Sequence, residues 1–253
     1  MAEKFDAAAR LAEGRPAVEN LQAFVWACRQ LGYAHPDLTA HAEQVREWYT
    51  SEDGLDLRAL GSDIAALDRA AAATREALDR QDDQLGVLAA GWRGAGADAS
   101  LAFLRRHGEA SRGVVDAVRT AAATLVRLRE DLWRAVDEKA ATATAVDDRT
   151  RVQRGEWLAA AQVVAMGGGD RSTASELVDL ELKEFVDNDV RGEWLPAMQS
   201  AQAAVADAYD AATGALAAAP AAEFEVPGAL GPAGPPPPSE GVAVTTPAAA
   251  TAP

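Results

Sequence analysis

The chain has few of the residues on which catalytic and metal sites usually depend. Its 253 residues include one cysteine and three histidines. No two histidines have a spacing that would place metal ligands on one face of a helix. The single cysteine, Cys28, lies in an apolar run without a partner for a disulfide, so we expect it to be buried. The sequence offers no candidate catalytic, cofactor-binding or metal-binding residues, and we interpret the protein as a non-enzyme.

Basic residues and long apolar runs are also scarce. The chain carries 24 Lys and Arg against 39 Asp and Glu, a formal net charge of -15. Such a surface repels nucleic acids and anionic membranes, which leaves a protein as the expected partner. No apolar run is long enough for a transmembrane segment, and residues 1–16 lack the pattern of a cleaved signal peptide. We therefore expect a protein that is made in soluble form in the cytoplasm.

Alanine supplies much of the apolar content, which is 49% of the chain. Alternating runs of β-branched residues, the usual signature of strands, are missing. Alanine has the strongest helix propensity and lets helices approach closely. These features predict an all-α fold.

Two long stretches predict a helical hairpin. In the first, apolar and small residues recur at alternating spacings of four and three, as in a coiled coil. The second carries a similar apolar stripe. The tetrapeptide Gly91-Trp92-Arg93-Gly94 separates them and reads as the hairpin tip. The first stripe consists of Leu60, Ile64, Leu67, Ala71, Thr74, Leu78, Gln81, Leu85, Leu88 and Trp92; the second of Leu101, Leu104, Val114, Val118, Ala121, Leu125, Leu128, Leu132 and Val136.

The stretch from Leu55 to Val146 resembles the WxG-motif helical hairpins that are substrates of type VII (ESX) secretion systems in actinobacteria. Trp92 and Gly94 match the Trp-x-Gly turn of that family. Its members also carry Tyr-x-x-x-Asp/Glu near the end of the second helix, where this chain has Trp133 and Asp137. Trp133 keeps the flat ring of the tyrosine but lacks its hydroxyl.

The resemblance implies a role in export. Trp92, Gly94, Trp133 and Asp137 would form a bipartite export or partner motif. The partner would be another helical hairpin or a second copy of the chain, with possible contacts to the secretion machinery. The protein would then be secreted or displayed on the cell surface without a cleaved signal peptide.

Other interpretations of the same residues remain open. Trp92 can simply fill the end of the helix pair, with Gly94 serving the turn. That role is compatible with the family resemblance. In a separate alternative, the Trp-x-Gly is a coincidental turn and the chain is a cytoplasmic adaptor or scaffold with no export role. A phosphate-binding loop at Gly91, Gly94 and Gly96 is disfavoured, because such loops follow a strand and this one follows a helix.

We expect an elongated helical bundle built on the long antiparallel hairpin. The sequence divides into four parts. Residues 1–52 form an N-terminal extension, with helices expected from Ala17 to Leu31 and from Asp37 to Tyr49. The hairpin occupies residues 53–147. Residues 148–219 form C-terminal helices, with a break or kink expected at Asp187-Asn188-Asp189. Residues 220–253, rich in proline and alanine, are expected to be a disordered tail.

Overall fold

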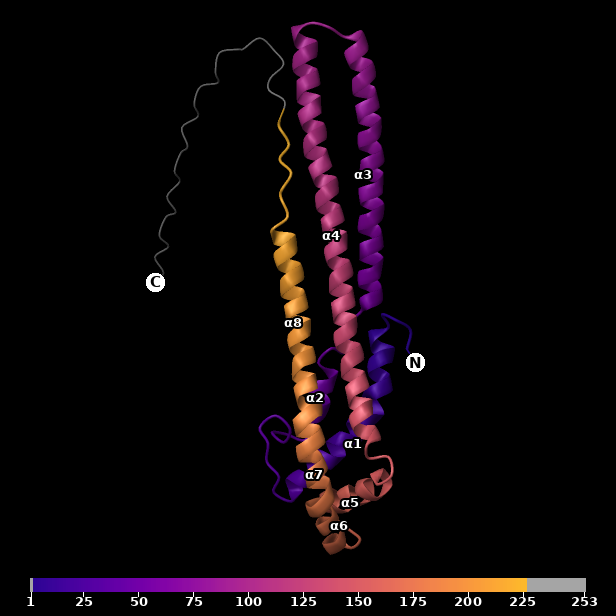
Figure 1. Cartoon of the computed structure of the whole chain (residues 1–253), viewed down its shortest axis with the longest axis vertical. Helices are drawn as coiled ribbons and strands as arrows, with labels where there is room; N and C mark the ends of the chain where they lie inside the picture. The colour runs from indigo at the N-terminus through magenta and orange to yellow at the C-terminus, as the bar shows by residue number, and fades with distance from the viewer. Residues whose placement is uncertain (1, 227–253) are drawn as a thin grey trace, which may run out of the picture.

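The computed structural model describes residues 2–226, and every regular element in this range is a helix (Figure 1). This confirms the predicted all-α fold class. None of these helices is long and apolar enough to cross a membrane. Residues 227–253 of the predicted tail lie outside the described residues. In chain order the elements are α1 (Ala7–Gln30), α2 (Gln44–Thr50), α3 (Leu57–Gly91), α4 (Ala95–Asp148), α5 (Arg154–Met166), α6 (Arg171–Leu177), η1 (Val178–Leu182), α7 (Lys183–Phe185), η2 (Val186–Trp194) and α8 (Leu195–Ala217).

Helices α3 and α4 form the predicted antiparallel hairpin, which is the longest feature of the molecule (Figure 1). Asp56 caps α3 by accepting hydrogen bonds from the backbone N–H groups of Arg58 and Ala59, at 3.0 and 2.8 Å. Helix α4 has 54 residues, and at 1.5 Å per residue it is about 80 Å long. The far end of the hairpin, opposite the C-terminal helices, is called the tip below.

The seam between α3 and α4 is regular but weakens toward the tip. Buried residues recur at every seventh position along each helix, which is the heptad spacing of a coiled coil. Beyond Leu78 the apolar residues of α3 become progressively exposed, and Leu88 is 38% exposed. The buried heptad positions are Leu57, Ile64, Ala71 and Leu78 on α3, and Leu101, Gly108, Val115 and Ala122 on α4.

At the other end, called the base, α4 is surrounded by the remaining helices. Helices α1 and α8 pack along α4, and α5 to η2 close the end (Figure 1). Phe24, Trp157 and Phe185 meet at ring-centroid distances of 5.4 to 6.1 Å in the centre of this core. One continuous hydrophobic cluster thus joins the N-terminal extension, the hairpin and the C-terminal helices.

The N-terminal helices differ from the prediction. Helix α1 begins at Ala7, with Asp6 as its cap, and continues through Pro16. Burial of Leu11 and Val18 on one face outweighs the local cost of the proline. The expected helix start at Asp37 is wrong. The Thr39 hydroxyl accepts a hydrogen bond from the backbone N–H of His35 and donates one to the backbone carbonyl of His35. These bonds favour a turn over a helix, and α2 begins only at Gln44.

The predicted break at Asp187-Asn188-Asp189 is also wrong. The chain remains helical from α6 to α8 and passes through this segment as the π-helix η2. Val186, Val190 and Trp194 are fully buried at intervals of four residues and hold η2 on the core. The π-helix η2 ends two residues before Pro196. In a regular α-helix the ring of a proline clashes with the carbonyl four residues earlier, and the wider π turn lies where that clash would occur.

Candidate recognition site

The hairpin turn is built around a glycine conformation. Trp92 ends α3 in an extended conformation, and its backbone N–H donates to the carbonyl of Leu88 at 2.9 Å. Gly94 precedes α4 with φ +114°, a backbone angle that residues other than glycine rarely adopt. Three residues therefore reverse the chain. The Trp92 side chain is left 43% exposed at the end of the molecule.

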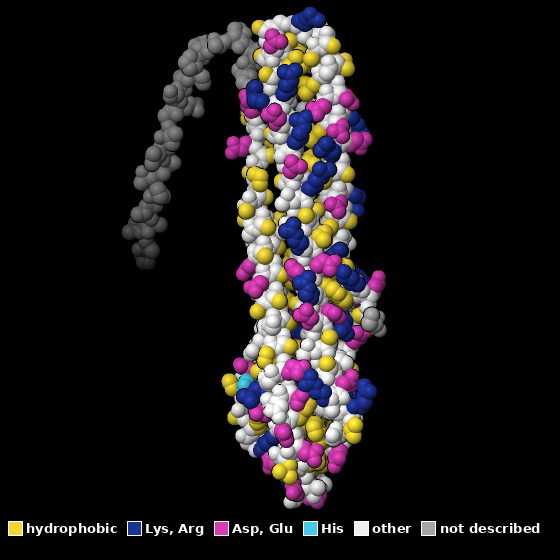
Figure 2. All heavy atoms as spheres, viewed as in Figure 1, with side chains coloured by type: hydrophobic (Ala, Val, Ile, Leu, Met, Phe, Trp, Pro, Cys, Tyr) yellow, Lys and Arg dark blue, Asp and Glu magenta, His cyan; other side chains and the backbone are white. Residues whose placement is uncertain are grey.

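Trp92 is one of three large apolar side chains that are exposed near the tip. Val87 and Leu88 on the last turns of α3 are 75% and 38% exposed. A hollow beside the ring is lined by Trp92, Leu101 and the arginines Arg93 and Arg105, among others. On the face shown in Figure 2, basic and acidic side chains are interspersed along the hairpin, and a basic side chain lies at its tip end.

The second predicted pair lies on the base half of α4. Trp133 is half-buried, and the edge of its ring meets Phe5 at a centroid distance of 5.9 Å. Asp137 accepts a hydrogen bond from Arg10 Nε at 2.6 Å. Both side chains therefore contact the N-terminal segment, a relationship that the sequence did not reveal.

One chain does not bring the two predicted pairs together. Gly94 and Trp133 lie at opposite parts of the same continuous helix, and the rise of an α-helix separates them by roughly 60 Å. Within one chain the two pairs therefore stay apart.

The residues that could support chemistry are engaged elsewhere. Cys28 is fully buried, and burial raises the pKa of its thiol to about 12. His41 Nε2 lies 3.2 Å from a carboxylate oxygen of Glu47. His107 lies between the rings of Phe103 and Phe224. Within residues 2–226, no group of three or more His, Cys, Asp or Glu could hold a metal ion.

Sequence reasoning missed a buried ion pair between Lys139 and Glu52. Lys139 Nζ also donates to Ser51 Oγ at 2.8 Å. Burial lowers the pKa of Lys139, partly offset by Glu52. The available signal was a lysine three residues after Val136, on the apolar stripe of α4.

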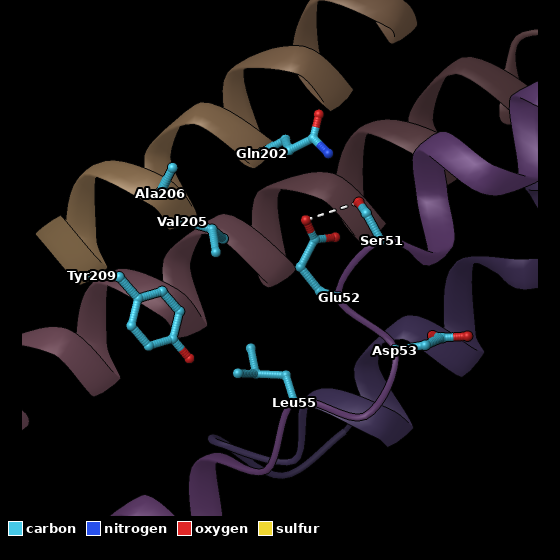
Figure 3. A pocket seen from close by; sticks show the side chains of 8 residues that line it. All are labelled: Ser51, Glu52, Asp53, Leu55, Gln202, Val205, Ala206 and Tyr209. Carbon is cyan, nitrogen blue, oxygen red and sulfur yellow. Dashed lines mark hydrogen bonds between the residues drawn. The ribbon is translucent and has the colours of Figure 1, made fainter. Parts of the chain in front are cut away.

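A hollow lies beside this ion pair, between α8 and the connection from α2 to α3 (Figure 3). Tyr209 and Val205 line it from α8, and Glu52, Asp53 and Leu55 line it from the connection. Both carboxylates already have partners, Lys139 for Glu52 and Arg15 for Asp53. The hollow therefore presents no unpaired carboxylate for acid–base chemistry.

No protein-family model matches the chain, and neither the curated proteins nor the solved structures include a match. The tip and the Trp133 pair thus stand as candidate recognition sites on their own geometry and on the sequence resemblance.

Proposed function

We propose that this chain is a non-enzymatic recognition protein of a type VII (ESX) secretion system, either a substrate or a secretion-associated protein. It acts by presenting the hairpin tip to a protein partner. The observation that carries the proposal is the half-exposed Trp92, which the Gly94 turn holds at the end of a long two-helix projection.

The arrangement of the other helices favours the tip as the contact surface. Helices α1 and α8 cover α4 at the base, and residues 218–226 follow α4 only as far as Arg106, which pairs with Glu225 at 2.6 Å (Figure 1). From there to the turn, α3 and α4 lack a third described helix. Val87, Leu88 and Trp92 are exposed apolar side chains in this region. Tryptophan is among the residues that contribute most to binding energy at protein interfaces.

The partner is proposed to be a helical hairpin, either a second copy or a separate small protein. An antiparallel hairpin would place its own tip beside the base half of α4. Trp92 of one chain would then lie near Trp133 and Asp137 of the other, and the secretion machinery would read both as one signal. The exported protein would be secreted or displayed on the cell surface.

Export of a tip variant tests the proposal. Tagged wild-type and Trp92→Ala chains would be expressed in an actinobacterial host with an active type VII system. Met166→Ala, an exposed apolar residue at the base, serves as the matched control. We expect severalfold less of the Trp92→Ala chain in the culture filtrate than of either other chain, when all three are present at equal levels in the cells.

Equal export of Trp92→Ala and Met166→Ala would contradict the tip proposal. Retention of every chain in the cells, with a known substrate still secreted, would favour the cytoplasmic adaptor. Circular dichroism of the purified variants checks that both remain helical.

A further inference from the structure

Residues 2–10 lie across the face of α4 that carries Trp133 and Asp137. Lys4 Nζ pairs with Glu130 at 3.0 Å, Phe5 meets Trp133, and Arg10 pairs with Asp137. The three partners on α4 are spaced by three and four residues, so they share one face of the helix. This N-terminal segment, called the strap below, therefore occupies both residues of the candidate motif at once.

The strap is fastened by few buried groups. Ala7 is its only buried residue. The Lys4–Glu130 pair is largely exposed, and exposed ion pairs contribute little to stability. Phe5 has φ +72°, an unfavourable value for a residue with a side chain. Helix α1 is anchored independently beyond the strap by the fully buried Leu11 and Val18. Residues 2–6, which precede α1, and the side chain of Arg10 can therefore leave α4 while α1 stays packed.

The cover is incomplete. Ala2, Lys4 and Arg10 of the strap form a hollow together with Trp133 and Asp137. The Trp133 side chain is only partly buried and lines this hollow. A partner can thus make a first contact at Trp133 before the strap is displaced.

We infer that the strap is a removable cover over a protein-binding surface formed by Trp133 and Asp137. The covering residues indicate the chemistry of the partner. It must offer a cation to Asp137 in place of Arg10, and an aromatic or apolar side chain to Trp133 in place of Phe5. The role of this surface in export rests on the function proposed above. The strap determines when the surface is accessible to the partner.

Release of the strap in the full-length chain tests the inference. The variant Phe5→Ala/Arg10→Ala removes both contacts with the motif. Arg15→Ala is the matched control, because it removes an exposed pair with Asp53 from the same helix and leaves the strap intact. We expect the released variant to reach the filtrate severalfold more than wild type or Arg15→Ala. Adding Asp137→Ala to the released variant should abolish the gain.

Acrylamide quenching of Trp133 fluorescence gives a second readout on purified protein. The Trp133 signal is the difference between each variant and the same variant carrying Trp133→Phe. It should be quenched more strongly in the released variant. If the double variant does not fold, Arg10→Gln keeps most of the side-chain length, removes the charge, and should show the same changes.

Two results would overturn the strap inference. One is equal export of the released and wild-type chains in a host that exports the wild type, or equal quenching of Trp133 in the two purified chains. The other is a gain that persists without Asp137. Failure of the proposed function is a different result, namely retention of every chain in the cells, or export that depends neither on the secretion ATPase nor on Trp92. Quenching of Trp133 then still tests the strap.

Discussion

Lys139 on α4 and Glu52 on the connection between α2 and α3 form an ion pair that is almost wholly removed from water. The pair ties the N-terminal extension to the hairpin near the point where α8 passes (Figure 3). The neighbouring pair of Arg15 with Asp53 joins the same parts of the molecule, but on the surface.

Glu52→Gln should be strongly destabilising, because it leaves the Lys139 ammonium buried without its counterion. Loss of one partner from a buried pair costs about 3–5 kcal/mol, and loss of an exposed pair about 0–1 kcal/mol. Asp53→Asn is therefore the matched control. Urea unfolding of the two variants measures the difference. Equal, small losses would show that water reaches Lys139.

Gly14→Ala should destabilise the contact between α1 and α2. A Cβ at this position would lie 2.2 Å from the hydroxyl of Tyr49, which donates to the carbonyl of Leu11 at 2.9 Å. Overpacking of this kind costs about 1–3 kcal/mol. The cost should be smaller in a Tyr49→Phe background, because the closest atom is then gone, and a double-mutant cycle measures this coupling.

A glycine in open space provides the comparison for that cycle. No atom lies within 4 Å of a Cβ added to Gly155 in α5. Gly155→Ala should therefore be neutral or stabilising by up to about 1 kcal/mol. Additive effects of Gly14→Ala and Tyr49→Phe would contradict the close approach.

As the pH falls, the wild type should become more stable relative to the Asp147→Asn variant. Burial raises the pKa of its carboxyl above the ordinary 3.8, although Asn20 and Arg154 partly offset this. The folded state thus holds this proton more tightly than the unfolded state. The unfolding free energy of wild type minus that of Asp147→Asn should rise as the pH falls from the raised pKa, and level off below 3.8. Unfolding curves at several pH values measure it; a fall would contradict the shift.

Trp92→Ala should have little effect on stability, whereas Trp194→Ala should have a large one. Trp194 is fully buried, and truncation of such a residue costs about 3–5 kcal/mol. The exposed Trp92 should cost about 1 kcal/mol or less. Thermal unfolding compares the two variants. Similar large losses would mean that Trp92 supports the fold and would weaken its assignment to recognition.

The hairpin was predictable because its signals are local and agree with each other. Stripes at spacings of three and four predict two helices, and Gly91 and Gly94 mark the turn between them. The same reasoning placed Trp92 at the tip. The gradual exposure of the seam was not predictable, since Leu85 and Leu88 fit the stripe as well as the buried Leu78 does.

The base was harder to predict because tertiary packing overrides local preference there. The first helix was expected to start at Ala17, yet α1 begins at Ala7 and burial of Leu11 and Val18 carries it through Pro16. The acidic segment at Asp187 suggested a break, yet the buried residues of η2 keep it helical. The contacts of Arg10 and Phe5 with the candidate motif span well over a hundred residues, and no sequence pattern announces them.

The most direct test of the proposed function is the distribution of the tagged wild-type chain between cell pellet and culture filtrate. It would be measured in an actinobacterial host with and without a functional type VII secretion ATPase, with a cytosolic protein as the lysis control. The account predicts the chain in the filtrate only when the ATPase is active. Retention in the cells under both conditions, while a known substrate is secreted normally, would contradict it.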